Sequence, residues 1–295
     1  MDFKNGKELL KRCAEAQLPI SSVMKQREVD LTEASETEIA ARMEKALQIM
    51  KDSAHLPLKE PVKSMGGLIG GEAAKLERSR QNQTAIGGAV LTKAITYAMA
   101  VLEVNASMGL IVAAPTAGSS GILPGLLLAL QEEYELSDDR IINGLFSASA
   151  IGYLAMRNAT VSGAMGGCQA EVGIASAMAA AAAVEIMGGT PEQCMHAAST
   201  ALMNLLGLVC DPIAGLVESP CQSRNAVGVA NALASAEIAL AGIVQILPLD
   251  EMLEAFMSVG RRLPRELRET ALGGCAATPT GCGFACTSQR GTHEK

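Results

Sequence analysis

The stretch CDPIAGLVESPC places two cysteines, Cys210 and Cys221, eleven positions apart in a segment built largely of Leu, Val, Ile, Ala and Gly. A zinc knuckle has a much shorter gap between its cysteines, so this spacing does not predict one. A third cysteine, Cys168, follows the pair Gly166 and Gly167. The flanking Gly and Pro residues put all three thiols at junctions of helix and loop. Three thiols at such junctions are typical of a polar site inside an apolar core.

The residues around these cysteines favour thiolates that bind a metal centre. Ser219 can cap a helix, Pro220 suits its first position, and Cys221 then lies in the first turn. Free amides and the helix dipole lower the pKa of a thiol there. Amides at helix starts also solvate the sulfurs of an anionic iron–sulfur cluster, and three thiolates leave one iron open to a substrate. An open cluster is therefore one hypothesis for Cys168, Cys210 and Cys221.

Two other interpretations of the cysteines stay open. A closed zinc site usually shows two short knuckles, and CGFAC near the C-terminus is the nearest match. Cysteine also packs as a small hydrophobic residue, which is the expectation for single thiols such as Cys13 and Cys194. The charged N-terminus shows no secretory signal, so we expect a cytoplasmic chain whose cysteines are thiols, ligands or redox groups rather than disulfides.

Charged residues stand three positions after two of the cysteines. CQAE puts Glu171 one helical turn beyond Cys168, and CQSR puts Arg224 one turn beyond Cys221. An Arg can bind a carboxylate with two hydrogen bonds, and a Glu can hold an ammonium group. These are the two charged groups of an amino acid. The alternative is that Glu171 and Arg224 pair with each other in a buried salt bridge.

A second candidate for substrate binding is the loop PTAGSSG. It offers Thr116, Ser119, Ser120 and several backbone amides immediately before a helix expected from Ile122. A carboxylate would fit this cradle, although an ordinary Gly/Pro turn has the same composition. Lys93 in VLTKAI is either a base or a cation on a helix surface, and the sequence favours neither.

The elements that position these residues are predicted to be helices. Aromatic residues make up 2% of the chain and Trp is absent, so Ala, Leu, Ile, Val and Met must fill the core. Ser35 resembles a helix cap, and EVGIASAMAAAAAVEIMGG is an Ala-rich helix that stops at a Gly pair. We expect a compact all-α fold of roughly ten helices. The periodic segments cover 81–103, 122–133, 138–156, 168–187, 191–208, 221–246 and 248–260.

Charge limits the possible partners. The formal charge of 24 − 31 = −7, without a Lys/Arg run, argues against nucleic acid and against a polybasic membrane patch. Residues 104–131 carry no charge and are long enough to span a bilayer, but APTAGSSGILPG lies at their centre, where lipid could not satisfy the backbone. We therefore expect a buried core and no membrane span. The predicted parts are a charged helical segment (1–60), an all-helical catalytic domain (61–270) and a cysteine-containing tail (271–295).

Several long stretches resemble one known family. GAMGGCQAEVG, GLVCDPIAGLVESPCQSRNA and APTAGSSGILPG are similar to the alpha chain of iron–sulfur-dependent L-serine dehydratases of the two-subunit bacterial type. The resemblance covers essentially the whole chain and includes SMGGLIGGEAAKLE and RETALGGCAATPTGC. It implies conversion of L-serine to pyruvate and ammonia on an oxygen-labile 4Fe–4S cluster, with a beta subunit that helps to complete the active site.

The resemblance also implies roles for individual residues. Cys168, Cys210 and Cys221 match the ligand positions of the cluster, and a cysteine near the C-terminus, closest to Cys282, would cap it at rest. Cys275 or Cys286 could take that place, or the three tail cysteines could form a separate zinc or redox group. The predicted catalytic residues are Lys93, Ser119 and Ser120. The predicted substrate-binding residues are Thr116, Gly118, Ser119, Glu171, Arg224 and Asn225.

One position of this sequence departs from the family pattern, and the chemistry of the site allows other functions. Fused, single-chain members carry a His shortly before LGL, where this sequence has Asn204, so no role of that His is transferred. Dehydration of serine needs a Lewis acid at its hydroxyl and a base at Cα. Pyridoxal phosphate needs a Schiff-base lysine, and no lysine lies between Lys93 and Lys295. The rivals are an L-cysteine desulfidase, an L-threonine dehydratase and a non-catalytic iron–sulfur sensor or binding subunit.

Overall fold

The structure is a computed structural model that describes residues 2–82 and 85–290, without the side chains of 285–290. Every regular element in these ranges is helical, and the one bridge of strand type joins Cys210 to Arg268. The α-helices are α1 (Gly6–Ala16), α2 (Ile20–Thr32), α3 (Glu36–Lys59), α4 (Glu72–Asn82), α5 (Gly88–Ala106), α6 (Ile122–Glu133), α7 (Asp138–Asn158), α8 (Gly163–Gly166), α9 (Ile174–Ile186), α10 (Pro191–Asn204), α11 (Cys221–Leu240), α12 (Leu249–Arg262) and α13 (Pro279–Arg290). The all-α prediction is confirmed.

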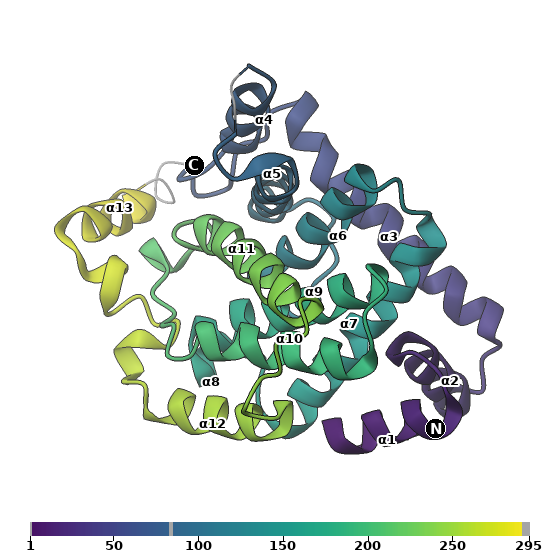
Figure 1. Ribbon diagram of the computed structural model, residues 1–295. Coiled ribbons are helices and arrows are strands. Elements are labelled where there is room, and N and C mark those ends of the chain that lie inside the picture. The colour runs from purple at the N-terminus through teal and green to yellow at the C-terminus, as the bar shows by residue number, and fades with distance from the viewer. Residues whose placement is uncertain (1, 83–84, 291–295) are drawn as a thin grey trace.

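The centre of the molecule is α9, around which α6, α7, α10 and α11 pack (Figure 1). Its sequence IASAMAAAAAVEI is almost entirely Ala and other apolar residues, and twelve of its thirteen residues are buried. Small side chains let the neighbouring helices approach closely. Gly228 of α11 shows this, because a Cβ there would overlap Ile122 of α6 and contact Val172. The fold therefore stacks small-residue faces rather than large aromatic groups.

The N-terminal helices belong to the same core. α2 packs against α7, and α3 packs against α5. Phe3, Leu9 and Ile20 are fully buried in the cluster that includes α9. α3 begins at the predicted cap, where the Ser35 hydroxyl accepts from the Glu38 amide and the Glu38 carboxylate accepts from the Ser35 amide. The charged segment thus contacts the core, and its assignment as a separate part stays a prediction.

Several predicted helix ends are wrong, and glycine explains most of them. The expected helix 81–103 is the end of α4 followed by α5, which begins at Gly88 with a positive φ of 71°. The expected helix 221–246 ends at Leu240, before Gly242 at φ 84°. The expected helix 191–208 ends at Asn204, before Gly207 at φ 86°. A left-handed glycine ends a helix at little steric cost.

Two segments are long and apolar enough to cross a membrane by length and composition alone. They are α5 and the run Gln169–Ile186, which joins the π turn η2 (Gln169–Gly173) to α9. Within the protein, 89% of the second window and 50% of the first is buried. The second segment is therefore the core helix that the Ala-rich sequence predicts.

Candidate active site

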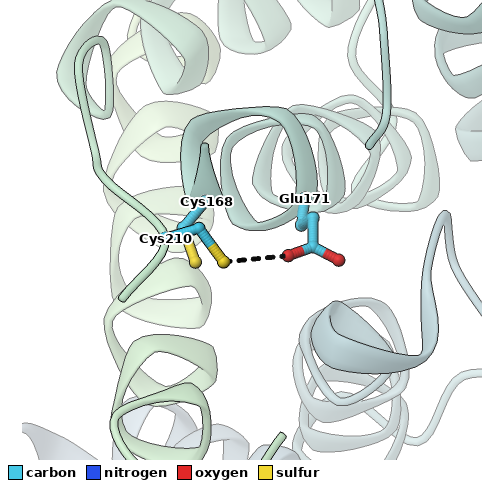
Figure 2. A group of neighbouring side chains, drawn as sticks. All are labelled: Cys168, Glu171 and Cys210. Atoms are coloured by element: carbon cyan, nitrogen blue, oxygen red, sulfur yellow. Dashed lines mark hydrogen bonds between the residues drawn. The ribbon is translucent and has the colours of Figure 1, made fainter. Parts of the chain in front are cut away.

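Two of the predicted ligands and the predicted acidic residue meet in one buried group. The sulfurs of Cys168 and Cys210 and a carboxylate oxygen of Glu171 all lie within 4.8 Å of one another. Figure 2 shows the two sulfurs side by side with the Glu171 carboxylate facing them, and the Cys210 thiol donates to Glu171 Oε2 over 3.9 Å. Both cysteines are 2% exposed. The structure thus brings together residues from the two separate motifs.

Cys168 and Glu171 face the same way because of an irregular helix start. Gly167 has a φ of 77°, and Cys168 follows it directly before the π turn η2. Glu171 lies inside that turn. Wide turns of this kind occur mostly at functional sites, since they redirect side chains within a helix.

Cys210 is held by the C-terminal part of the chain and not by a helix end. Its amide donates to the Leu267 carbonyl over 2.9 Å, and its carbonyl accepts from the Glu269 amide over 2.7 Å. This corrects the prediction that Cys210 lies at a junction of helix and loop. The backbone around Cys210 is extended, and both of its hydrogen-bonding groups are used by a segment almost sixty residues later in the sequence.

Cys221 is the first residue of α11, one position earlier in the helix than predicted. It is buried and has a free thiol. Burial, together with the nearby charges of Cys168 and Glu171, raises its pKa to about 12. It therefore lies near the Cys168–Glu171–Cys210 group, although it is not one of the three that meet within 4.8 Å.

Arg224 supplies the positive charge of the site. Its Nη1 donates to Cys168 Sγ over 3.4 Å and to the Val209 carbonyl over 2.8 Å. Its Nη2 forms an ion pair with Asp211 Oδ1 at 2.6 Å. The buried bridge considered as an alternative between Arg224 and Glu171 is therefore replaced by one to Asp211.

The two neighbouring thiols shift each other's pKa in opposite directions. The hydrogen bond from Cys210, helped by the charge of Arg224, lowers the pKa of Cys168 below the ordinary thiol value. The same bond and burial raise the pKa of Cys210. Cys168 is therefore the more readily ionised of the two thiols, which favours it as a metal ligand.

The loop PTAGSSG lies directly against Glu171. The Thr116 hydroxyl donates to Glu171 Oε1 over 2.8 Å, and Thr116 Oγ1 lies 3.1 Å from Ser119 Oγ. A Cβ at Gly118 would come within 3.3 Å of the same carboxylate oxygen. Ser120 instead donates to the Ala117 carbonyl within its own turn. Of the loop residues, Thr116 and Gly118 thus face the acid, Ser119 contacts Thr116, and Ser120 completes the turn η1 (Ala117–Ser119).

Asn225 joins this loop to the helix of Cys221. Its amide donates to the carbonyls of Gly118 (2.8 Å) and Cys221 (2.9 Å), and its oxygen accepts from the Gly121 amide over 3.1 Å. The side chain is fully buried, and all of these contacts are to backbone. It holds two loops of the site in register.

Glu171 is a buried carboxyl in an acidic neighbourhood. Burial raises its pKa above the ordinary value, the charge of Glu269 adds to this, and the hydrogen bond from Thr116 opposes it. Gly163 leaves room beside the carboxylate, since a Cβ there would lie 2.7 Å from Glu171 Oε2 and 3.2 Å from Glu269 Oε2. The buried Glu171 carboxyl is therefore stabilised when it is protonated or when it binds a cation such as an ammonium group.

Lys93 lies elsewhere. Its Nζ is 3.0 Å from Glu132 Oε2, in the last turn of α6, whereas the loop of Thr116 precedes the first turn. A helix rises about 1.5 Å per residue, so the two ends of α6 are roughly 15 Å apart. The structure does not bring Lys93 together with the other candidate residues.

The sequence of the chain matches the family model described as the serine dehydratase alpha chain, over residues 15–276. The chain belongs to this family. It is 48% identical to the probable L-serine dehydratase alpha chain of Bacillus subtilis over 95% of this chain and 93% of that protein. It is 45% identical to the L-serine dehydratase alpha chain of Peptoniphilus asaccharolyticus over 95% and 96%. It is also 36% identical to L-serine dehydratase TdcG of Escherichia coli. The matched region covers 93% of this chain but 62% of that relative.

In this serine dehydratase alpha chain, the tail cysteines whose side chains the structure describes, Cys275 and Cys282, have their contacts beside the site. Cys275 donates its amide to Asp211 Oδ2 over 2.6 Å. Cys282 is exposed, and its thiol donates to the Ala276 carbonyl over 3.6 Å. The side chain of Cys286 lies outside the described side chains. The capping role of Cys282 stays a prediction.

Two acidic residues of the serine dehydratase alpha chain were missed in the sequence. Asp211 pairs with Arg224, and the buried Glu218 accepts from the Ser64 hydroxyl (2.7 Å) and from the amides of Gly66 (2.6 Å) and Leu68 (2.8 Å). Glu218 thereby fixes the loop SMGGLIGG against the segment before Cys221. The sequence does single them out, because Asp211 and Glu218 are the two charged residues between the predicted ligands Cys210 and Cys221.

Proposed function

We propose that this chain is the catalytic subunit of an L-serine dehydratase, which eliminates water from L-serine and releases pyruvate and ammonia. The observation that carries the proposal is the buried group of Cys168, Glu171 and Cys210 against the loop of Thr116. The names of the relatives at 45% and 48% identity support the same reaction.

The donor set fits a 4Fe–4S cluster. Cys168, Cys210 and Cys221 are buried free thiols, and Arg224 donates to the Cys168 sulfur as outer-shell groups do around such clusters. We propose these three cysteines as its ligands. When bound, the cluster would supply a Lewis acid at the serine hydroxyl, which is otherwise a poor leaving group.

The chain's own residues would orient the amino acid. The backbone amides at the start of η1 offer hydrogen-bond donors for a carboxylate, and Arg224 offers a positive charge next to Cys168. The Glu171 carboxylate would hold the ammonium group. Asn225 keeps the loop and α11 together, and burial excludes bulk water from the group.

A path for the Cα proton follows from the hydrogen bonds. Ser119 Oγ lies 3.1 Å from Thr116 Oγ1, which donates to Glu171 Oε1 over 2.8 Å. A proton taken at Ser119 Oγ can therefore pass through Thr116 to the carboxylate. A buried carboxylate with a raised pKa is suited to accept it. Of the three predicted catalytic residues, this path uses Ser119, and Ser120 supports its turn.

A second chain completes the proposed enzyme. The single-chain relative TdcG extends well beyond the part that this chain matches, since 62% of it is covered. We propose that a beta subunit supplies the remainder. A cytoplasmic location follows from the need to keep the three thiols reduced.

The test is anaerobic purification of this chain together with a beta subunit, followed by iron and sulfide counts and a pyruvate assay. We expect about four irons per alpha chain, as in a cubane cluster, and turnover of L-serine above that of L-threonine and L-cysteine. Cys168→Ala, Cys210→Ala and Cys221→Ala should each lose iron, whereas Cys13→Ala, which removes a buried thiol on α1, should keep it. A colourless, zinc-containing and fully active enzyme would overturn the proposal. Bound iron without turnover of any of the three amino acids would favour a sensor.

A further inference from the structure

The side chain of Asp211 joins the site to the C-terminal segment. It follows Cys210 directly, and the side chain is 3% exposed. Oδ1 lies 2.6 Å from Arg224 Nη2, and Oδ2 accepts from the Cys275 amide over 2.6 Å. One buried carboxylate thus binds a guanidinium of α11 with one oxygen and the backbone of the tail with the other.

The other nitrogen of Arg224 contacts the site itself. Nη1 lies 3.4 Å from Cys168 Sγ and 2.8 Å from the Val209 carbonyl. The guanidinium is planar and rigid, so a shift of Nη2 toward or away from Asp211 also moves Nη1 relative to the Cys168 sulfur. The position of the Asp211 carboxylate therefore sets the orientation of the guanidinium.

The C-terminal segment from residue 265 onward also contacts Cys210 and the turn that follows Asp211. Leu267 and Glu269 hydrogen-bond to the backbone of Cys210, and α13 packs against the turn η3 (Ile213–Gly215). In Figure 1 this segment runs along one side of the molecule, from α12 to α13. At Gly274, φ is 59° and a Cβ would overlap the Asp211 carboxylate. The close approach of the tail to Asp211 thus requires glycine at this position.

We propose that Asp211 is a positioning residue that couples docking of the tail segment, residues 265–277, to the orientation of Arg224 beside Cys168. When the tail leaves, the carboxylate loses its second partner and is free to rotate, and Arg224 follows. The kinetic part of this inference rests on the proposed function, because it assumes that Arg224 binds the serine carboxylate. The docking part does not.

The test compares Gly274→Ala with Gly283→Ala in the complete enzyme. The first change pushes the tail away from Asp211 without altering any side chain of the site. The second adds a methyl group in α13, and among the described atoms outside the helix's own backbone nothing lies within 4 Å of it. Hydrogen exchange is measured at the amides of Cys275 and Cys210, and KM and kcat are measured for L-serine. We expect Gly274→Ala to speed exchange at both amides and to raise KM about tenfold with a smaller change in kcat, as for loss of a hydrogen bond to a charged group. Gly283→Ala should match wild type.

A double-mutant cycle isolates the coupling. Asp211→Asn removes the charge that orients Arg224, so it should itself raise KM, and adding Gly274→Ala to it should change KM no further. Faster exchange in Gly274→Ala with an unchanged KM would overturn the inference, as would equal effects of Gly274→Ala in both backgrounds. If wild type turns over no serine, the proposed function fails. The coupling is then read from the alkylation rate of Cys168, which both changes should slow by moving the guanidinium away from the thiolate. An unchanged alkylation rate would overturn it.

Discussion

Lys93 Nζ lies 3.0 Å from Glu132 Oε2, inside a polar cluster that ties three helices together. The Tyr97 hydroxyl of α5 reaches both Glu132 oxygens at 2.8 Å, and His55 Nε2 of α3 lies 3.3 Å from Oε1. All four side chains sit at the end of α6 that is remote from Thr116. The arrangement gives Lys93 a structural partner and no contact with the proposed active site.

Replacing Lys93 separates its two predicted roles. Because the Lys93 side chain is 12% exposed and its amine is paired, we expect Lys93→Met to lower the free energy of unfolding by about 2 kcal/mol. The value of kcat/KM for L-serine should stay within about threefold of wild type, far from the loss of roughly 100-fold or more expected for a general base. Lys45→Met, at an exposed position of α3, is the control. A 100-fold loss of activity in a folded Lys93 variant would restore Lys93 as the base.

The same cluster predicts how acid unfolds the protein. Burial alone would raise the pKa of Glu132, but hydrogen bonds from His55, Tyr97 and Lys93 outweigh it and lower the pKa to about 2. A carboxyl whose pKa is lower in the folded state stabilises the fold above its unfolded pKa of about 4.5, and this contribution is lost as the pH falls toward 2.

Urea unfolding between pH 2 and 6 checks this sign. In wild type the free energy of unfolding should fall as the pH drops below about 4.5. Glu132→Gln should have lower stability at pH 6 and a shallower slope below 4.5, whereas Glu133→Gln, at the exposed neighbouring position, should keep the wild-type slope. Identical slopes in all three proteins would mean that Glu132 is not held ionised by this cluster.

The local parts of the fold were predictable, and the long-range parts were not. Ser35 and Glu38 predict their helix start because a capping box involves four consecutive positions. Cys168 could likewise be placed at a helix start from the Gly pair before it. Cys210 could not be placed, because it is held by Leu267 and Glu269 through backbone bonds that leave no mark on the residue types.

The candidate site divides in the same way. The spacing of Cys168 and Glu171 correctly indicated a shared face, since their ligand atoms meet within 4.8 Å. The partner of Arg224 was not predictable from spacing, because Asp211 lies thirteen positions before it on a separate loop. A buried cation needs a partner, and the spacing pointed to Glu171 instead of Asp211.

Glu171 is expected to be essential for turnover and dispensable for the metal centre. Glu171→Gln keeps the shape of the side chain and removes the charge that would hold the ammonium group and accept the proton. We expect kcat/KM for L-serine to fall by roughly 100-fold or more, with iron and sulfide contents unchanged.

The matched control for Glu171 is Glu269→Gln, since Glu269 is the other carboxylate near Gly163. It should keep most of the activity, because it acts on Glu171 through charge alone. If Glu171→Gln loses iron as well as activity, the carboxylate is a metal ligand, as its place beside the two sulfurs would allow.

The tail thiols give the last prediction. A mobile thiolate can satisfy an open iron at rest, and Cys282 is the tail cysteine that the family resemblance places closest to this role. In the structure its thiol contacts the Ala276 carbonyl, so capping requires the tail helix to move. Cys275 starts nearer, since its amide already donates to Asp211. The Asp211 carboxylate also interacts with the Cys275 thiol and raises its pKa, which disfavours a thiolate ligand. We expect Cys282→Ser to assemble the cluster normally, to lose it faster in air and to change the dependence of rate on serine concentration. Cys275→Ser and Thr280→Ala, an exposed change in α13, should behave like wild type.

The measurements are iron content, bleaching of the visible absorption in air and initial rates. If Cys282→Ser is indistinguishable from wild type and Cys275→Ser is oxygen-sensitive, Cys275 is the cap. If neither variant differs from wild type, neither Cys275 nor Cys282 caps the cluster.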